Sequence, residues 1–266
     1  MRADLGNVLS RVREKKPLIH HITNWVTIYD AAALTRAFGA LPVMAHAVEE
    51  SADMTAISDA LVLNIGTLTS PVFEAMLKSA NAAKKKGIPI VLDAVGAGAT
   101  KFRTEKSLKL LSCGVDVVKG NAGEIASLCG YKAKVRGVES VHADSPIEAA
   151  FKLAGKYRCV VVITGREDVV VGSEGMYIVK NGHEMMGRVV GTGCMAASSI
   201  GVFAAVEKDL LKACAYALSC FCIAGELAAK KSSGPMEFKN RIIDEVYRLD
   251  GRKAGRMAKI EWQERE

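Results

Sequence analysis

Short apolar runs rich in β-branched residues alternate along this chain with segments whose apolar residues lie three or four positions apart. The runs are typical of buried strands, and the spacing between them is typical of amphipathic helices. This pattern predicts strands at 17–22, 60–64, 88–92, 115–118 and 160–163, and helices at 29–38, 72–86, 105–111, 122–129 and 147–156. We therefore expect an α/β three-layer sandwich, with a mostly parallel central sheet and helices on both faces.

The alternation changes near residue 169. Two strand-like runs within 169–180 flank Ser173-Glu174-Gly175, which is a hairpin turn signal, so we expect an antiparallel edge there. Three helices are expected to follow at 193–206, 210–230 and 235–248, whereas the residues from Gly251 onward have no assignable pattern. Because no linker, repeat or shift in composition divides the 266 residues, residues 1–266 are predicted to form a single domain.

Composition narrows the class of protein. Half of the residues are hydrophobic, which excludes a disordered chain, and the net charge of +7 is spread along the sequence, so nucleic acid is not expected as a partner. Seven cysteines without paired spacing, together with an N-terminus that lacks an apolar signal core, predict a cytoplasmic protein with reduced thiols. The uncharged stretch 189–206 approaches the length of a membrane span, but its glycines and serines favour a buried helix and no membrane partner.

The loop Gly191-Thr192-Gly193-Cys194 opens directly into an apolar helix. In open α/β sheets, ligands bind beyond the carboxyl ends of the strands, and a helix start with free N–H groups suits a phosphate or a developing anion. The helix dipole at this position is expected to lower the pKa of the Cys194 thiol. An ordinary turn with a small buried cysteine is the structural alternative.

Polar residues follow three further predicted strands. Asp93 precedes a glycine loop and can hold Mg²⁺ through water, although this motif alone favours an Asp that makes turn hydrogen bonds. Glu124 lies three residues after Asn121, a spacing that suits a functional carboxylate and equally a helix capping box. Lys119 can meet a phosphate or be solvated, and Thr164 ends a strand where a hydroxyl can contact a nucleotide.

Taken in order, these segments resemble the hydroxyethylthiazole kinase family, a thiamine-salvage family of the ribokinase-like superfamily. The resemblance spans about residues 17–206. It is carried by His20-His21-Ile22-Thr23-Asn24, Pro42-Val43-Met44-Ala45, Asn64-Ile65-Gly66-Thr67-Leu68, the Asp93 loop, Gly120-Asn121-Ala122-Gly123-Glu124, Thr164-Gly165 and Gly191-Thr192-Gly193-Cys194. Each segment is weakly specific alone, but their order is highly specific.

The resemblance implies a ribokinase-like fold and transfer of the ATP γ-phosphate to the hydroxyl of 4-methyl-5-(2-hydroxyethyl)thiazole. It also implies a requirement for Mg²⁺ and a homotrimer with active sites between subunits. By position, the resemblance implies that Met44 and Gly191 contact the thiazole, with Asn24, Gly66 and Thr67 nearby, and that Lys119 and Thr164 contact the nucleotide. It further implies that Asp93 and Glu124 organise Mg²⁺. The anion hole is expected to consist of Gly191, Thr192, Gly193 and Cys194.

The chain departs from the family pattern at a few positions. The wider superfamily usually has an Asp base where Cys194 stands, so positioning and charge neutralisation are expected to carry most of the catalysis here. Ala94 replaces a common Pro, Lys119 a frequent Arg and His21 a common Cys.

Two alternatives differ in function class. One is a kinase for another small alcohol, such as hydroxymethylpyrimidine or a sugar. The other is a nucleotide- or thiazole-binding protein without turnover, against which the retained Asp93, Glu124 and Gly191 to Gly193 argue.

Overall fold

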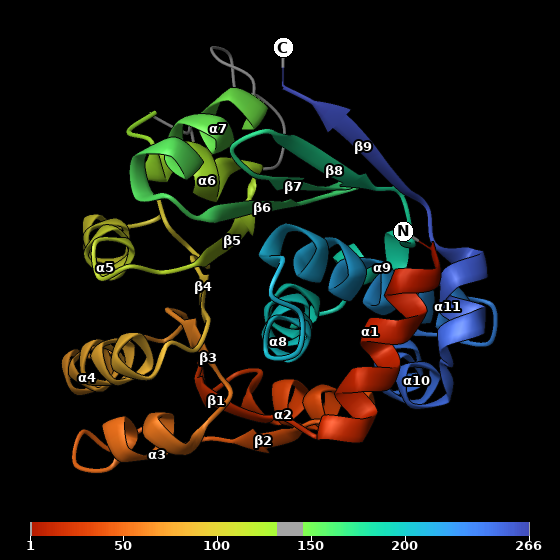
Figure 1. Cartoon of the computed structure of the whole chain (residues 1–266), viewed down its shortest axis with the longest axis horizontal. Helices are drawn as coiled ribbons and strands as arrows, with labels where there is room; N and C mark the ends of the chain where they lie inside the picture. The colour runs from red at the N-terminus through yellow and green to blue at the C-terminus, as the bar shows by residue number, and fades with distance from the viewer. Residues whose placement is uncertain (1, 132–145, 266) are drawn as a thin grey trace.

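The computed structural model describes residues 2–131 and 146–265 of the chain, and the strands within them form one sheet (Figure 1). Their order across the sheet is β2-β1-β3-β4-β5-β6-β7-β8-β9. The first six strands along the chain run parallel, and β7, β8 and β9 are antiparallel to their neighbours. The strands are β1 Leu18–Ile22, β2 Leu41–Val43, β3 Ala60–Asn64, β4 Ile90–Asp93, β5 Val117–Asn121, β6 Val160–Thr164, β7 Asp168–Val171, β8 Gly175–Val179 and β9 Ile260–Glu264.

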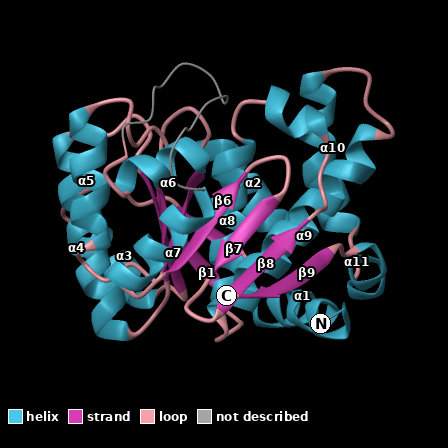
Figure 2. Cartoon of the chain, turned by 90° about the horizontal axis from the view of Figure 1, so that it is seen from above, coloured by secondary structure: helices cyan, strands magenta, loops and turns pink. Residues whose placement is uncertain are grey.

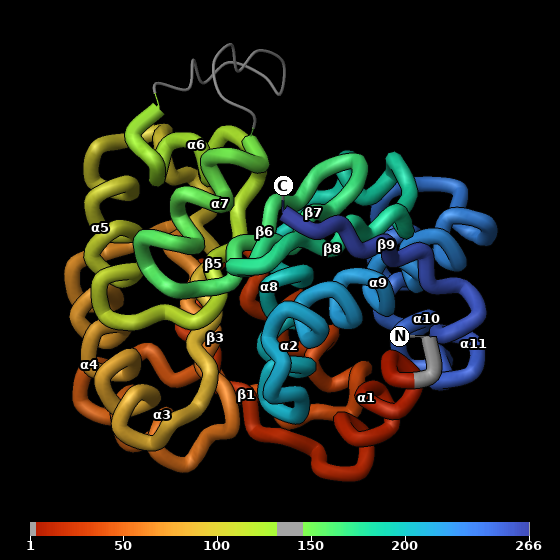
Figure 3. Tube along the Cα trace, turned by 45° about the horizontal axis from the view of Figure 1, so that its top comes forward, coloured from red at the N-terminus to blue at the C-terminus, as the bar shows by residue number. Residues whose placement is uncertain are grey.

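Helices cover both faces of the sheet (Figures 1 and 2). One face carries α3 Ser51–Ile57, α4 Ser70–Lys86, α5 Lys101–Leu111, α6 Ala122–Leu128 and α7 Pro146–Tyr157. The other face carries α1 Arg2–Lys15, α2 Ile28–Phe38, α8 Thr192–Ala204, α9 Leu210–Ala229, α10 Pro235–Arg248 and α11 Gly251–Met257. The short helix η1 Glu184–Arg188 contacts α10. The tube view shows α1, near the N-terminus, beside α11 (Figure 3), where the Cβ position of Gly6 is 2.7 Å from the Gly251 carbonyl oxygen.

Alternate residues of the central strands feed two separate cores, because successive side chains of a strand point to opposite faces. Val62, Val91 and Val117 belong to the core beneath α8 and α9, while Leu63 and Leu92 belong to the core beneath α4 and α5. Strands buried on both faces require the continuous apolar runs that the sequence shows. The carboxyl ends of β3, β4 and β5 meet at one edge of the sheet, and the cores on both faces fix the positions of these strands.

The fold class is confirmed, and so is the antiparallel hairpin: β7 and β8 pair across the turn, where Gly172 N–H donates to the Gly175 carbonyl (2.9 Å). β9 pairs with β8 and forms the outermost strand. The pattern did not indicate α1, β2, α3, η1, α11 or β9. That the chain is a single domain stays a prediction.

Most of the uncharged stretch 189–206 forms a helix as predicted: α8 covers Thr192–Ala204 and is buried from Met195 to Ala204, whereas Val190 before it is exposed. Among the described residues, one helix is long and apolar enough to cross a membrane by length and composition, namely α9, and 72% of its apolar window is buried inside the protein. α9 packs between α8 and α10 as a core helix.

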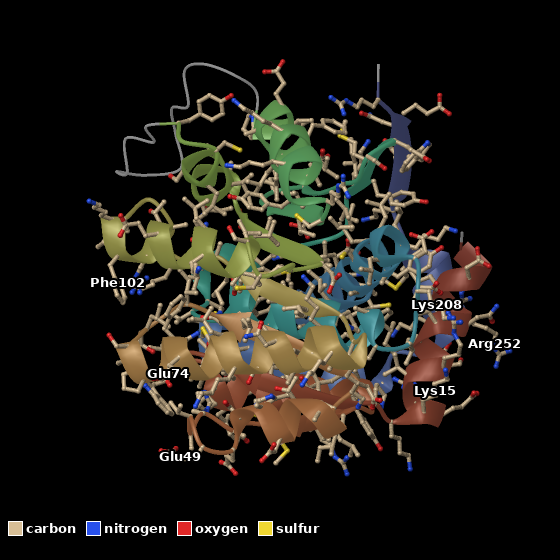
Figure 4. All side chains as sticks on the ribbon, turned by 60° about the vertical axis from the view of Figure 1, so that its left-hand side comes forward. Lys15, Glu49, Glu74, Phe102, Lys208 and Arg252 are labelled. Carbon is tan, nitrogen blue, oxygen red and sulfur yellow. The ribbon has the colours of Figure 1, made fainter. Side chains whose placement is uncertain are left out.

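Charged side chains project from the periphery. Lys15, Lys208 and Arg252 lie toward one end of the molecule, and Glu49 and Glu74 lie toward the other (Figure 4). These labelled side chains come from different segments of the chain.

Candidate active site

Three polar side chains stand next to one another at the carboxyl edge of the sheet. Asn64 pairs in register with Asp93, and Asp93 pairs with Lys119, on the neighbouring strands β3, β4 and β5. The Asn64 amide donates to Asp93 Oδ2 (2.7 Å), and Lys119 Nζ donates to Asp93 Oδ1 (3.0 Å). We call these three residues the polar row; all are buried, Asp93 completely.

Charge and burial oppose each other in the polar row. Burial alone lowers the pKa of Lys119, but the negative charges of Asp93 and Glu124 outweigh it and leave that pKa raised. Burial raises the pKa of Asp93, while the Lys119 charge opposes this rise. Removing either partner of an ion pair this buried strongly destabilises the protein, because the remaining charge stays buried without a counter-charge.

The start of α8 faces this row. Gly191 caps the helix in the left-handed conformation (φ 104°), which favours glycine, and a Cβ there would lie 2.9 Å from Thr27 Cγ2. The first helical hydrogen bond is donated by Met195 to the Gly191 carbonyl, and no side chain among the described residues caps the helix. The N–H groups of Thr192, Gly193 and Cys194 thus precede that bond, as an anion site at a helix start requires.

Lys119 and α8 approach each other closely. A Cβ at Gly193 would lie 3.2 Å from Lys119 Nζ, so glycine leaves room for the ammonium beneath the helix start. One positive charge and the positive end of a helix dipole therefore converge on the same place.

Cys194 is held by two amides. Its Sγ accepts from Asn24 Nδ2 (3.3 Å) and from Asn64 Nδ2 (3.2 Å). Burial, followed by the negative charge of Asp93, raises the pKa of this thiol. The expected lowering by the helix dipole is wrong, because burial and the carboxylate beneath the helix outweigh the dipole. Cys194 is consequently a neutral thiol at neutral pH.

Asn64 is a central residue of the site to which sequence reasoning gave no role. Besides its two amide donations, its Oδ1 accepts from Gly66 N–H (2.9 Å) and from Asn24 (3.0 Å). The sequence contained a sign of this role, because Asn64 is the last residue of a predicted strand and that strand lies beside the one that ends in Asp93.

Glu124 makes the capping box that its spacing allows. Its Oε2 accepts from Asn121 N–H (2.7 Å), while Asn121 Oδ1 accepts from Glu124 N–H (2.9 Å). Its Oε1 accepts from Gly96 N–H (2.7 Å), in the glycine loop after Asp93. Glu124 therefore ties two loops together, and this role does not exclude a second one toward a metal.

The donor set suits Mg²⁺ through water rather than by direct ligation. Each carboxylate oxygen of Asp93 and Glu124 already accepts one hydrogen bond from the protein. Among the described residues, no cluster of three or more His, Cys, Asp or Glu could hold a metal ion. Mg²⁺ in kinase sites keeps several waters and binds substrate phosphates with few carboxylates, so these two residues fit that mode.

The remaining candidates lie around this centre. Thr164 pairs in register with Asn121 and its hydroxyl donates to the Gly120 carbonyl (3.4 Å), which places it beside the Glu124 loop. Gly66 N–H donates to Asn64 of the polar row, and Thr67 Oγ1 accepts from the N–H of Trp25 (3.2 Å), the residue after Asn24. Met44 follows β2, the edge strand, and β1 separates β2 from β3, so the chain does not bring Met44 next to the polar row.

Comparison with known proteins agrees with this geometry. Residues 9–252 match the hydroxyethylthiazole kinase family. The chain is 57% identical to hydroxyethylthiazole kinase of Methanosarcina acetivorans over 97% of this chain and 99% of that one, and 58% identical to that of Methanosarcina mazei over the same shares.

Solved structures show the same relationship. The hydroxyethylthiazole kinase of Pyrococcus horikoshii has a TM-score of 0.89 at 41% identity, covering 98% of this chain and 99% of that one. A pyridoxal kinase from Staphylococcus aureus, at 14% identity over 93% of this chain and 98% of that one, has a TM-score of 0.63 and shares the fold alone. Sequence and fold agree over nearly the whole length, and the chain belongs to the hydroxyethylthiazole kinase family, which phosphorylates the alcohol of hydroxyethylthiazole.

Proposed function

We propose that this chain transfers the γ-phosphate of ATP to the hydroxyl of 4-methyl-5-(2-hydroxyethyl)thiazole at the polar row, in thiamine salvage, with Mg²⁺ as the metal. The observation that carries the proposal is the close approach of the Lys119 ammonium to the uncapped start of α8, where a Cβ at Gly193 would lie 3.2 Å from Lys119 Nζ. Asp93 pairs with Lys119, but no side chain among the described residues caps the N–H groups at the start of α8, so a phosphoryl group in transfer can accept hydrogen bonds from them beside the Lys119 ammonium.

In this reaction the acceptor oxygen forms a bond to the γ-phosphorus, and the bond from that phosphorus to the β-γ bridging oxygen breaks to release ADP. Lys119 and the N–H groups of Gly193 and Cys194 bind the charge that develops on the transferred group. Mg²⁺, held through water by Asp93 and Glu124, would neutralise charge on the phosphates when bound. Thr164 contacts the nucleotide from the end of β6.

Cys194 acts in this proposal as a positioning group beside the acceptor hydroxyl. A neutral thiol is a poor base, and a loose transition state needs little early deprotonation. The hydroxyl proton leaves late, to the transferred phosphoryl group or to solvent. Asn24, Gly66, Thr67, Met44 and Gly191 are proposed to surround the thiazole.

We further propose a cytoplasmic homotrimer in which neighbouring subunits complete each site. Met44 lies away from the polar row within one subunit, and large apolar side chains are exposed at the start of α2, beside Gly191 and at the start of α10. These are Trp25, Val26, Tyr29, Val190 and Met236. Native mass spectrometry gives the subunit number, and activity regained on mixing Met44→Ala with Gly193→Val subunits would support shared sites. A monomer with full activity contradicts this assembly.

The reaction is tested by mass-spectrometric detection of the phosphorylated thiazole after incubation with ATP and Mg²⁺. Parallel reactions contain hydroxymethylpyrimidine, a sugar, or no metal. We expect thiazole phosphate only with Mg²⁺. Product from another alcohol alone would favour the other small-alcohol kinase, and thiazole binding without any product would favour a binding protein.

A further inference from the structure

A second buried carboxylate lies at the ligand-binding edge of the sheet and has no part in the mechanism above. Asp168 is the first residue of β7, and its side chain is almost fully buried, with 6% of the residue exposed. Because β7 runs antiparallel to β6, the start of β7 lies beside the end of β6, where Thr164 stands. Asp168 therefore reaches this edge from a strand that begins there.

The Asp168 carboxylate closes the turn between these two strands. Its Oδ1 accepts from Gly165 N–H (3.1 Å), and its Oδ2 accepts from the Cys222 thiol of α9 (3.5 Å). One oxygen is thus bound to the turn and the other to a buried core helix. The residue after Thr164 is fixed relative to α9, and so is the direction in which the chain leaves β6.

A buried carboxylate is a costly way to close a turn. Burial raises the pKa of Asp168 to about 6, and the hydrogen bond from Gly165, the Cys222 thiol and the positive charge of Lys119 oppose that rise. An asparagine in a turn can accept a backbone N–H through its amide oxygen without the cost of burying a charge. The acceptor at Asp168 holds the residue that directly follows Thr164, and the Lys119 charge acts on the same carboxylate, so this turn is tied to the site.

We infer that Asp168 is a positioning residue for the nucleotide: by holding Gly165 N–H it sets the place of Thr164 at the phosphate-donor side of the site. This inference rests on the proposed nucleotide contact of Thr164. Asp168 itself is too buried to touch the substrate, so its effect must pass through the turn.

Three variants test the inference. Asp168→Ala removes the acceptor of the Gly165 N–H, whereas Asp168→Asn keeps an oxygen that can accept it. Glu167→Ala, in the same turn but exposed, is the matched control. KM is measured separately for ATP and for the thiazole alcohol, ADP binding is measured by calorimetry, and thermal unfolding checks the fold.

For Asp168→Ala we expect the KM for ATP and the Kd for ADP to rise about tenfold, a change of about 1.4 kcal/mol. The KM for the thiazole should stay within about twofold, because a displaced Thr164 affects only the part of the site that binds the nucleotide. Asp168→Asn should restore most of the nucleotide affinity, and Glu167→Ala should resemble the wild type. If Asp168→Ala does not fold, Asp168→Ser, whose side chain is too short to reach Gly165 N–H, replaces it.

A folded Asp168→Ala protein with unchanged ADP affinity overturns the inference, as does an equal rise in both KM values. Failure of Asp168→Asn to restore affinity overturns it too, because the hydrogen bond would then not be the cause. Failure of the proposed function would give a different result: the wild type would form no thiazole phosphate, while ADP calorimetry would still measure the effect of Asp168 on nucleotide binding.

Discussion

The surroundings of Cys194 determine what this residue can do. Two amide N–H groups point at its sulfur, and a carboxylate lies beneath it. The sequence predicted the helix start correctly, but the effect of Asp93 on the thiol arises from a contact across 101 residues of chain, which no local pattern reports. The role of Asn64 was not predicted for the same reason, because it depends on four hydrogen bonds rather than on the residues beside Asn64 in sequence.

Replacing Cys194 tests whether the thiol is a base. Because the thiol positions the acceptor and is a poor base, Cys194→Ala should lower kcat only modestly, by no more than the roughly 10²- to 10⁴-fold that acid–base catalysis contributes. Cys194→Asp should remain active because both amides can donate to a carboxylate. Steady-state kinetics and circular dichroism of both variants provide the measurement. A folded but inactive Cys194→Asp would show that this account of the residue is wrong.

Asp93→Asn should have a larger effect than Cys194→Ala. The variant leaves the Lys119 ammonium buried beside an amide, and loss of one partner of a buried pair costs about 3 kcal/mol or more. We expect a lower unfolding free energy and a rate that needs more Mg²⁺ for saturation. Denaturant unfolding separates the two effects, with Asp93→Asn combined with Lys119→Met as the control that removes the orphaned charge. An unchanged Mg²⁺ dependence would remove Asp93 from the metal site.

Among whole elements, long periodic segments were predicted best. The strand at 60–64 and the helix at 235–248 have the predicted bounds, and the other expected strands and helices were found with ends shifted by a few residues. β2 has only three residues, too few to show a period. In β9, only Ile260 and Trp262 alternate with polar residues, which is too short a pattern to indicate a strand, and an exposed edge strand can carry charged residues.

The C-terminal strand is expected to stabilise the sheet edge. The Trp262 ring packs on Tyr177 (centroids 4.8 Å apart), and β9 covers the hydrogen-bonding edge of β8. Trp262→Ala should lower the unfolding free energy by about 1 kcal/mol, and truncation after Lys259 should lower it further. Glu261→Gln, which breaks only an exposed ion pair with Lys180, is the control and should change it by less than about 1 kcal/mol. Equal unfolding midpoints for the truncated and full chains would contradict this expectation.

At the scale of the molecule, buried ionisable groups make stability depend on pH. His21 is completely buried, and burial lowers its pKa to about 3. The unfolded chain binds a proton at His21 near pH 6.5 and the folded chain does not, so this residue's contribution is full above pH 6.5 and is lost as the pH falls toward 3. Asp168 acts in the opposite direction: its raised pKa makes its contribution fall as the pH rises from 3.8 to about 6.

His21→Cys should therefore flatten the fall of unfolding free energy between about pH 6.5 and 4, by up to about 1.4 kcal/mol per pH unit. The variant is less stable at neutral pH if a cavity forms, so the slope rather than the absolute value is the test. Urea unfolding at several pH values measures it, with the exposed His183→Gln as control. Identical slopes for wild type and His21→Cys would show that His21 does not titrate as described.

The polar row has a consequence for how the chain reaches its native state. Its amide, carboxylate and ammonium come from β3, β4 and β5, whereas the cysteine that covers Asn64 lies 130 residues further along the chain. A growing chain can align these strands long before α8 exists, and until then water solvates the ion pair. Dehydration of the pair is thus a late event, and substitutions at Asp93 should speed unfolding far more than they slow refolding. Stopped-flow measurements that found the opposite would place the docking of α8 on the polar row before the rate-limiting step of folding.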